Sequence, residues 1–98
     1  MTRDQVVEAL KREEVAIRRY GATSLYLFGS AARDELGPES DIDVFIDYVR
    51  DGSLGFRELC LIEDRIGSVL SRRVDLTTRE GLHRSLREHI VRSSTRVF

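Results

Sequence analysis

The sequence has little cysteine, no long apolar run and almost no net charge, and each shortage excludes a class of protein. Cys60 is the only cysteine, so the chain cannot form an internal disulfide or a cysteine-based zinc site. No stretch approaches the roughly 20 apolar residues that a membrane-spanning helix needs. The opening MTRDQVVEAL lacks the apolar segment of a secretory signal. We therefore expect a cytoplasmic protein with no membrane partner.

The charge balance excludes proteins that bind nucleic acid without sequence preference. Such proteins need a strongly basic surface, whereas the formal net charge here is -1 at pH 7. We expect no direct nucleic-acid binding, although this balance permits one bound nucleotide. His83 and His89 are isolated from each other, and this placement is more typical of surface helix residues than of a metal pair.

The apolar periodicity predicts a small α/β domain that spans residues 1–98. Thr2 and Gln5 have the spacing of a capping box, and Gly21 suits the end of the helix that follows. In chain order we expect a helix at about 3–20 that could break in its middle, a strand at 24–28, a short helix at 30–36, a loop at 37–40, a strand at 41–47, a helix at 54–70, a strand at 73–77 and a last helix from about Arg79. Residues 95–98 could add a short strand or fray. Three to four strands would then form a small mixed sheet with helices packed on it.

Carboxylates stand out on two of the predicted strands. Asp41 and Asp43 are two residues apart and therefore lie on one face of their strand, as does Asp47, which we expect to be solvated. A polar face is often the solvent side of an antiparallel sheet. However, Asp is a poor strand former, and Asp75 recurs in a second apolar strand. If these strands are adjacent, three carboxylates converge and would raise one another's pKa values unless a cation is present.

Magnesium would remove this repulsion, because it prefers oxygen ligands and is often held by a few carboxylates together with substrate phosphates. Of two ions, one could activate an attacking hydroxyl and the other could neutralise phosphate charge. Asp41 and Asp43 would serve both ions, and Asp75 would complete the catalytic site and could accept the proton of the hydroxyl. Upstream, Gly29 lets the backbone approach a phosphate closely, and Ser30 can donate a hydrogen bond to it. Such a pair also marks ordinary turns, so its weight comes from its place before the acids.

The combination LFGSAAR…SDIDVFID, with Asp75 later in Val-Asp-Leu, resembles the signature of the polymerase-beta-like nucleotidyltransferase superfamily. Within it, the chain is similar to the minimal nucleotidyltransferases, the MntA-type antitoxins usually encoded beside a helical HEPN-domain toxin. The resemblance implies that Gly29 and Ser30 bind a nucleoside triphosphate. It implies that Asp41 and Asp43 hold two Mg²⁺ ions and that Asp75 is the third catalytic and metal-binding acid. It also implies transfer of AMP from ATP to a tyrosine hydroxyl of the HEPN toxin.

Two neighbours of the Gly-Ser pair also bear on phosphate binding in this resemblance. Arg33 matches a basic residue that is common after the pair and could contact a phosphate. Asp34 stands where relatives often have glycine, and an acid there would weaken phosphate binding unless it faces solvent.

The short chain leaves few residues for an acceptor-binding lobe, so we expect the acceptor to belong to a partner protein. The expected last helix carries Arg79, Arg84, Arg87 and Arg92, which could form a docking face or simply a solvated charged face.

Two other functions remain open at this level. The chain could be a non-catalytic antitoxin that blocks its partner by occlusion, although three intact carboxylates argue against this. It could also transfer a nucleotide to a small molecule or RNA, although the near-neutral charge disfavours an RNA acceptor. A homo-oligomer is compatible with either function.

Overall fold

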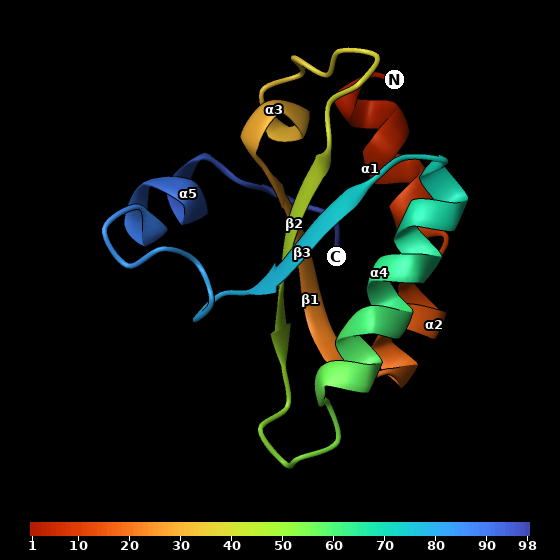
Figure 1. Cartoon of the computed structure of the whole chain (residues 1–98), viewed down its shortest axis with the longest axis vertical. Coiled ribbons are helices and arrows are strands. Elements are labelled where there is room, and N and C mark those ends of the chain that lie inside the picture. Colours follow the sequence, from red (N-terminus) through yellow and green to blue (C-terminus); the bar gives the residue numbers. More distant parts are fainter.

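The computed structural model describes residues 1–98, and a four-stranded sheet of order β3-β2-β1-β4 lies at its centre (Figure 1). The strands are β1 (Ala22–Phe28), β2 (Ile42–Tyr48), β3 (Val74–Thr78) and β4 (Thr95–Arg96). β1 pairs antiparallel with both β2 and β4, whereas β2 and β3 run parallel. The predicted mixed sheet with packed helices is therefore confirmed, and residues 95–96 supply its short fourth strand.

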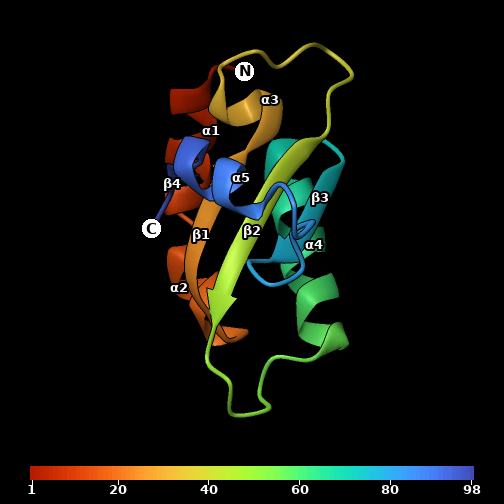
Figure 2. The ribbon, with the colours of Figure 1, turned by 90° about the vertical axis from the view of Figure 1, so that its left-hand side faces the viewer.

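The helices lie on both faces of the sheet and at one end of it (Figures 1 and 2). They are α1 (Arg3–Lys11), α2 (Glu14–Arg19), α3 (Gly29–Ala32), α4 (Phe56–Leu70) and α5 (Arg87–Ser93). α1, α2 and α4 cover one face, α5 lies on the other, and α3 follows directly after β1. The first helix breaks after Lys11, as the sequence allowed, and the predicted capping box of Thr2 and Gln5 is present.

The main core lies between the sheet and the layer of α1, α2 and α4. Every second residue of β2 points into it, and these residues, Ile42, Val44 and Ile46, are fully buried. Ile62 and Ile66 of α4 meet them from the helix layer, one helical turn apart. This packing holds β2 flat against α4, so the alternate residues of β2 must face the opposite side of the sheet.

The opposite face of the sheet is aromatic in its middle and not simply solvent-exposed. Phe45 of β2 is fully buried there and stacks on Tyr26 of β1, with ring centroids 4.7 Å apart. Phe28 lies next to the same ring, at 5.8 Å between centroids. The segment from Arg79 to the end of α5 crosses this face (Figure 2), and its Leu82 is also buried. Phe45 thus faces the same way as Asp43, as predicted, but in a packed environment.

Two helix predictions were wrong in extent. The helix expected at 30–36 ends at Ala32, because Asp34 adopts the left-handed conformation (φ 59°) and Glu35 N–H bonds back to Ser30 O. The last helix begins at Arg87 and not at Arg79. Residues 79–86 form turns instead, in which the Gly81 N–H donates to the Thr78 hydroxyl. No helix of the structure combines the length and the apolar character needed to cross a membrane.

Candidate active site

Gly29 joins β1 to α3 in a conformation that only glycine adopts easily. Its φ is +65°, and a Cβ at this position would collide with the carboxylate of Asp43. Ser30 follows in the first turn of α3, where backbone N–H groups lack partners within the helix. The missing side chain of Gly29 therefore lets the turn and the Asp43 carboxylate lie in contact. A substituent on the turn would separate the predicted phosphate cradle from the predicted metal ligand.

Asp43 and Asp75 are direct neighbours across the parallel pair of β2 and β3. Neighbouring strands lie about 4.8 Å apart, so two carboxylates in register on one face are close enough to interact strongly. The pKa of Asp43 is raised, first by burial and then by the negative charges of Asp75 and Asp41, while Arg33 acts in the opposite direction. The adjacency on which the convergence of the acids depended is thus found, together with the repulsion expected from it.

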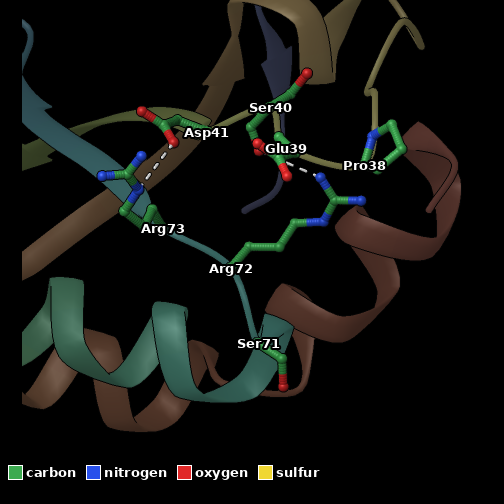
Figure 3. Close-up of a pocket in the computed structure, with 7 residues that line it drawn as sticks. All are labelled: Pro38, Glu39, Ser40, Asp41, Ser71, Arg72 and Arg73. Carbon is green, nitrogen blue, oxygen red and sulfur yellow. Dashed lines mark hydrogen bonds and ion pairs between the residues drawn. The ribbon is translucent and has the colours of Figure 1, made fainter.

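Asp41 lies one residue before β2 and is held differently from Asp43. Its side chain is about half exposed, and its Oδ1 lies 3.6 Å from Nε of Arg73 (Figure 3). The three aspartates do not form a closed three-ligand cluster in this structure. The structure thus brings Asp43 and Asp75 together and leaves Asp41 engaged with an arginine at the edge of the site.

The donor set fits magnesium. Asp41, Asp43 and Asp75 offer only carboxylate oxygens, and Mg²⁺ is commonly held by one or two carboxylates while phosphates and waters complete its shell. Burial raises the pKa of Asp43 most, and the negative charges of Asp75 and Asp41 raise it further; a bound cation would offset this repulsion. A closed protein cage is not required for such an ion.

Arg33 and Asp34 point in different directions. Arg33 forms an exposed ion pair with Glu35 at 3.1 Å. The positive charge of Arg33 also acts on Asp43, where it partly offsets the rise in the pKa of that carboxyl. The Asp34 Oδ1 accepts a hydrogen bond of 2.7 Å from the N–H of Arg3, the first residue of α1. The Asp34 carboxylate therefore caps a neighbouring helix and does not oppose a phosphate at Ser30.

Asp47 was predicted to be solvated, but it is only partly exposed and is bound by an arginine. Arg79 donates two hydrogen bonds to its carboxylate, at 2.8 and 2.9 Å, and these bonds lower the pKa of Asp47. The guanidinium also lies over the rings of Tyr26 and Phe45, at 5.2 and 5.3 Å from their centroids. The parallel register could have revealed this pair, because Arg79 follows Asp75 by as many residues as Asp47 follows Asp43.

The predicted docking face is only partly present. Arg79 lies outside any helix and is held by Asp47, so a continuous helical row of arginines does not exist. The four arginines nevertheless line one groove of about 500 Å³ together with Glu88 and Val91. Arg84 and Arg92 are the exposed members of the set. The groove remains a candidate surface for an acidic partner. Its Arg79 lies over Phe45, which faces the same side of the sheet as Asp43.

Two arginines near the acids were missed by the sequence analysis. Arg72 and Arg73 connect α4 to β3, and with the turn at 38–41 they line a polar cavity of about 270 Å³ (Figure 3). No local pattern identifies them, because their partners lie more than 30 residues away in the chain.

Comparisons with known proteins agree with this geometry. The model of the nucleotidyltransferase domain family matches residues 4–97. MJ1217 of Methanocaldococcus jannaschii, which carries the provisional name of a protein adenylyltransferase, is 34% identical over 83 residues, covering 84% of this chain and 83% of that protein. Protein adenylyltransferase MntA of Thermococcus cleftensis is 29% identical over 94 residues, covering 94% of this chain and 92% of that protein.

Solved structures share the fold. One described as a minimal nucleotidyltransferase superposes with a TM-score of 0.74 at 27% identity, covering 91% of this chain and 93% of that one. A complex of a tri-AMPylated Shewanella oneidensis HEPN toxin with an MNT antitoxin contains a chain that matches with a TM-score of 0.64 at 18% identity, over 94% of this chain and 71% of that one. This second likeness concerns the fold alone. With a family model that matches nearly its whole length, the chain belongs to the nucleotidyltransferase domain family, as a nucleotidyltransferase of the minimal type.

Proposed function

We propose that this single domain is a magnesium-dependent protein adenylyltransferase that transfers AMP from ATP to a tyrosine hydroxyl of a partner HEPN toxin and thereby silences it. The observation that carries the proposal is the contact of the Gly29 turn with Asp43, which lies in register with Asp75. This juxtaposition suits a reaction in which phosphates must be held directly beside metal-binding carboxylates.

The residues of the site would divide the work of the reaction. The backbone at Gly29 and the hydroxyl of Ser30 would orient the triphosphate, and Arg33 would add a positive charge beside it. Mg²⁺ would be held by the three aspartates and would supply charge neutralisation on the phosphates and activation of the hydroxyl.

The chemical step is a single displacement at the α-phosphorus. The acceptor oxygen forms a bond to this phosphorus, and the bond between the phosphorus and the oxygen bridging to the β-phosphate breaks. Pyrophosphate leaves with the electron pair of the broken bond. Asp75 would accept the proton of the hydroxyl, since an exposed carboxylate on the open side of β3 is placed to reach an incoming acceptor.

The proposed partner rests on the relatives. The Thermococcus protein is named as a protein adenylyltransferase, and the Shewanella complex joins an MNT antitoxin to an AMPylated HEPN toxin. A protein acceptor in a cytoplasmic toxin–antitoxin pair would also explain why the chain carries a groove lined by four arginines.

The test is transfer of label from α-³²P-ATP to the proposed partner, a HEPN-domain protein of the same genome, with Mg²⁺ present. The wild type should label that protein on tyrosine, and Asp43→Asn should reduce labelling by roughly 1,000-fold, because it removes charge from the centre of the site. Asp64→Asn is the matched control, since Asp64 is an exposed aspartate on α4.

Other results would favour other functions. Equal labelling by wild type and Asp43→Asn would refute the catalytic role of the site. Full protection of cells by Asp43→Asn would indicate an antitoxin that acts by occlusion. Labelling of RNA or of a small molecule in place of the protein would identify a different acceptor.

A further inference from the structure

Asp41 needs a support that the sheet does not provide. β2 begins at Ile42, so the backbone of Asp41 lies outside the ladder that fixes Asp43. The residues before Asp41 form the turn 37–40. This turn lies between Asp41 and α3, the helix that begins at the proposed phosphate-binding residues Gly29 and Ser30. The position of a metal ligand at the end of a surface turn is fixed only if the turn itself is held by other contacts.

Arg72 holds this turn from outside. Its Nη1 donates to the carbonyl oxygen of Gly37 at 2.8 Å and to that of Ser40 at 3.2 Å. Figure 3 shows Arg72 reaching toward Ser40. Within the turn, the Gly37 N–H donates to the Ser40 hydroxyl at 2.9 Å. A single charged donor thus joins the first and last residues of the turn, and bonds from a guanidinium are stronger than neutral ones.

The next residue anchors the other side of Asp41. The Arg73 carbonyl oxygen accepts a hydrogen bond of 2.9 Å from the N–H of Ile42. The junction between α4 and β3 therefore forms hydrogen bonds with the chain both before and after Asp41. The Arg73 side chain, by contrast, is 89% exposed and meets only the Asp41 carboxylate, at 3.6 Å.

We propose that Arg72 is a positioning residue, which acts through the carbonyl oxygens of the turn 37–40 to hold Asp41 where it can share a divalent cation with Asp43. This inference rests on the proposed function, because it assumes that the aspartates bind a metal. It assigns to Arg72 no contact with substrate.

Removal of Arg72 should change the affinity for a cation in opposite directions, depending on whether Arg72 acts through its charge or through its support of the turn. Loss of a positive charge near three carboxylates should tighten the binding of a cation. Loss of the support for a metal ligand should weaken it, typically by about tenfold or more. The sign of the change therefore separates a positioning role from a purely electrostatic one.

The experiment titrates Mn²⁺ alone into the full chain and measures free Mn²⁺ by electron paramagnetic resonance. Arg72→Ala should weaken Mn²⁺ binding by about tenfold relative to the wild type. Arg73→Ala is the matched control, since it removes the same charge one residue away but leaves the turn intact, and it should bind Mn²⁺ as well as the wild type or better.

A second variant keeps the test valid if Arg72→Ala folds poorly. Ser40→Ala removes the hydroxyl that accepts the Gly37 N–H and changes no charge. It should also weaken Mn²⁺ binding, by a smaller factor, while thermal melting verifies that the protein is folded.

The outcomes are distinguishable. If the wild type binds Mn²⁺ and both Arg72→Ala and Ser40→Ala bind it equally well, the positioning role is overturned and the metal site stands. If Arg73→Ala weakens binding as much as Arg72→Ala, the specific role of Arg72 is likewise overturned. If the wild type binds no Mn²⁺, the metal site of the proposed function is refuted, and this inference is refuted with it.

Discussion

At the scale of single residues, Gly29 combines a positive φ with a close contact to a carboxylate of the candidate site. Its positive φ alone would strain any other residue, but Gly52 has a positive φ as well, at 86°. What distinguishes Gly29 is the carboxylate of Asp43, which occupies the space a side chain would need, whereas a Cβ at Gly52 would meet nothing. A substitution at Gly52 therefore tests backbone strain alone, whereas one at Gly29 tests backbone strain together with a steric clash.

We expect Gly29→Ala to lower AMP transfer by about 100-fold, because the turn and the Asp43 carboxylate must move apart. Its free energy of unfolding should also fall, by about 1–2 kcal/mol from the left-handed backbone. Gly52→Ala should show a similar loss of stability with unchanged transfer. Denaturant unfolding and the labelling assay measure the two effects, and equal transfer by both variants would contradict the proposed role of the contact.

At the scale of elements, the ion pair of Asp47 and Arg79 ties β2 to the segment after β3. Its two hydrogen bonds and the stacking of Arg79 on Tyr26 and Phe45 hold this segment in a fixed, non-helical course. The backbone agrees, because the N–H of Arg79 donates to Ile46 O and so extends the parallel ladder. These contacts, formed by residues distant in sequence, outweigh the helical tendency of residues 79–86.

This pair should make stability depend on pH in acid. The folded-state pKa of Asp47 lies below the ordinary value of 3.8, so its contribution is present above about pH 4 and is lost as the pH falls through the lowered pKa. Asp47→Asn should therefore be less stable than the wild type by about 1 kcal/mol at neutral pH, a value discounted because the pair is partly exposed.

Urea unfolding of both proteins at a series of pH values measures this difference. It should shrink below pH 4 and vanish in stronger acid. Glu14→Gln is the control, since its pair with Arg18 is an exposed i,i+4 contact on α2, and it should change stability by only about 0.3–0.5 kcal/mol. A difference for Asp47→Asn that stays constant down to the lowest pH would exclude the ion pair as its cause.

At the scale of the whole molecule, the sheet has two unlike faces. α1, α2 and α4 close one face with an aliphatic core, and the segment from Arg79 to the end of α5 covers only the middle of the other (Figure 2). The acids lie on this second face, where it remains open beside α3. The same sheet therefore serves as a rigid core support on one side and as a candidate reaction surface on the other.

Leu82 packs the segment after β3 onto the second face of the sheet, and its side chain is only 5% exposed. Leu86, four residues later, is 52% exposed. We expect Leu82→Ala to lower the free energy of unfolding by about 2–4 kcal/mol, because it leaves a cavity. Leu86→Ala should change it by no more than about 0.5 kcal/mol. Denaturant unfolding of both variants provides the measurement, and equal losses would show that the segment packs as a regular amphipathic helix.

Much of this protein follows from the sequence alone, because local patterns carry the information. Alternation along β2 determines that Asp43 and Ile42 face opposite sides, and helical periodicity determines the buried stripe of α4. The capping box at Thr2 and the turn at Gly29-Ser30 also follow from residues next to them. So do the acids themselves, whose placement on strands is unfavourable without a ligand.

The tertiary structure alone decided which of these faces meet. The register of β2 with β3 brings Asp43 opposite Asp75, and the same register pairs Asp47 with Arg79 and so prevents a helix at 79–86. It also places Arg72 against the turn before Asp41. These contacts join residues more than 30 positions apart, and their energies depend on strand pairing that no local window of sequence contains. The Gly29 turn and the acids were therefore predictable as parts, whereas their assembly into one site depends on the folded sheet.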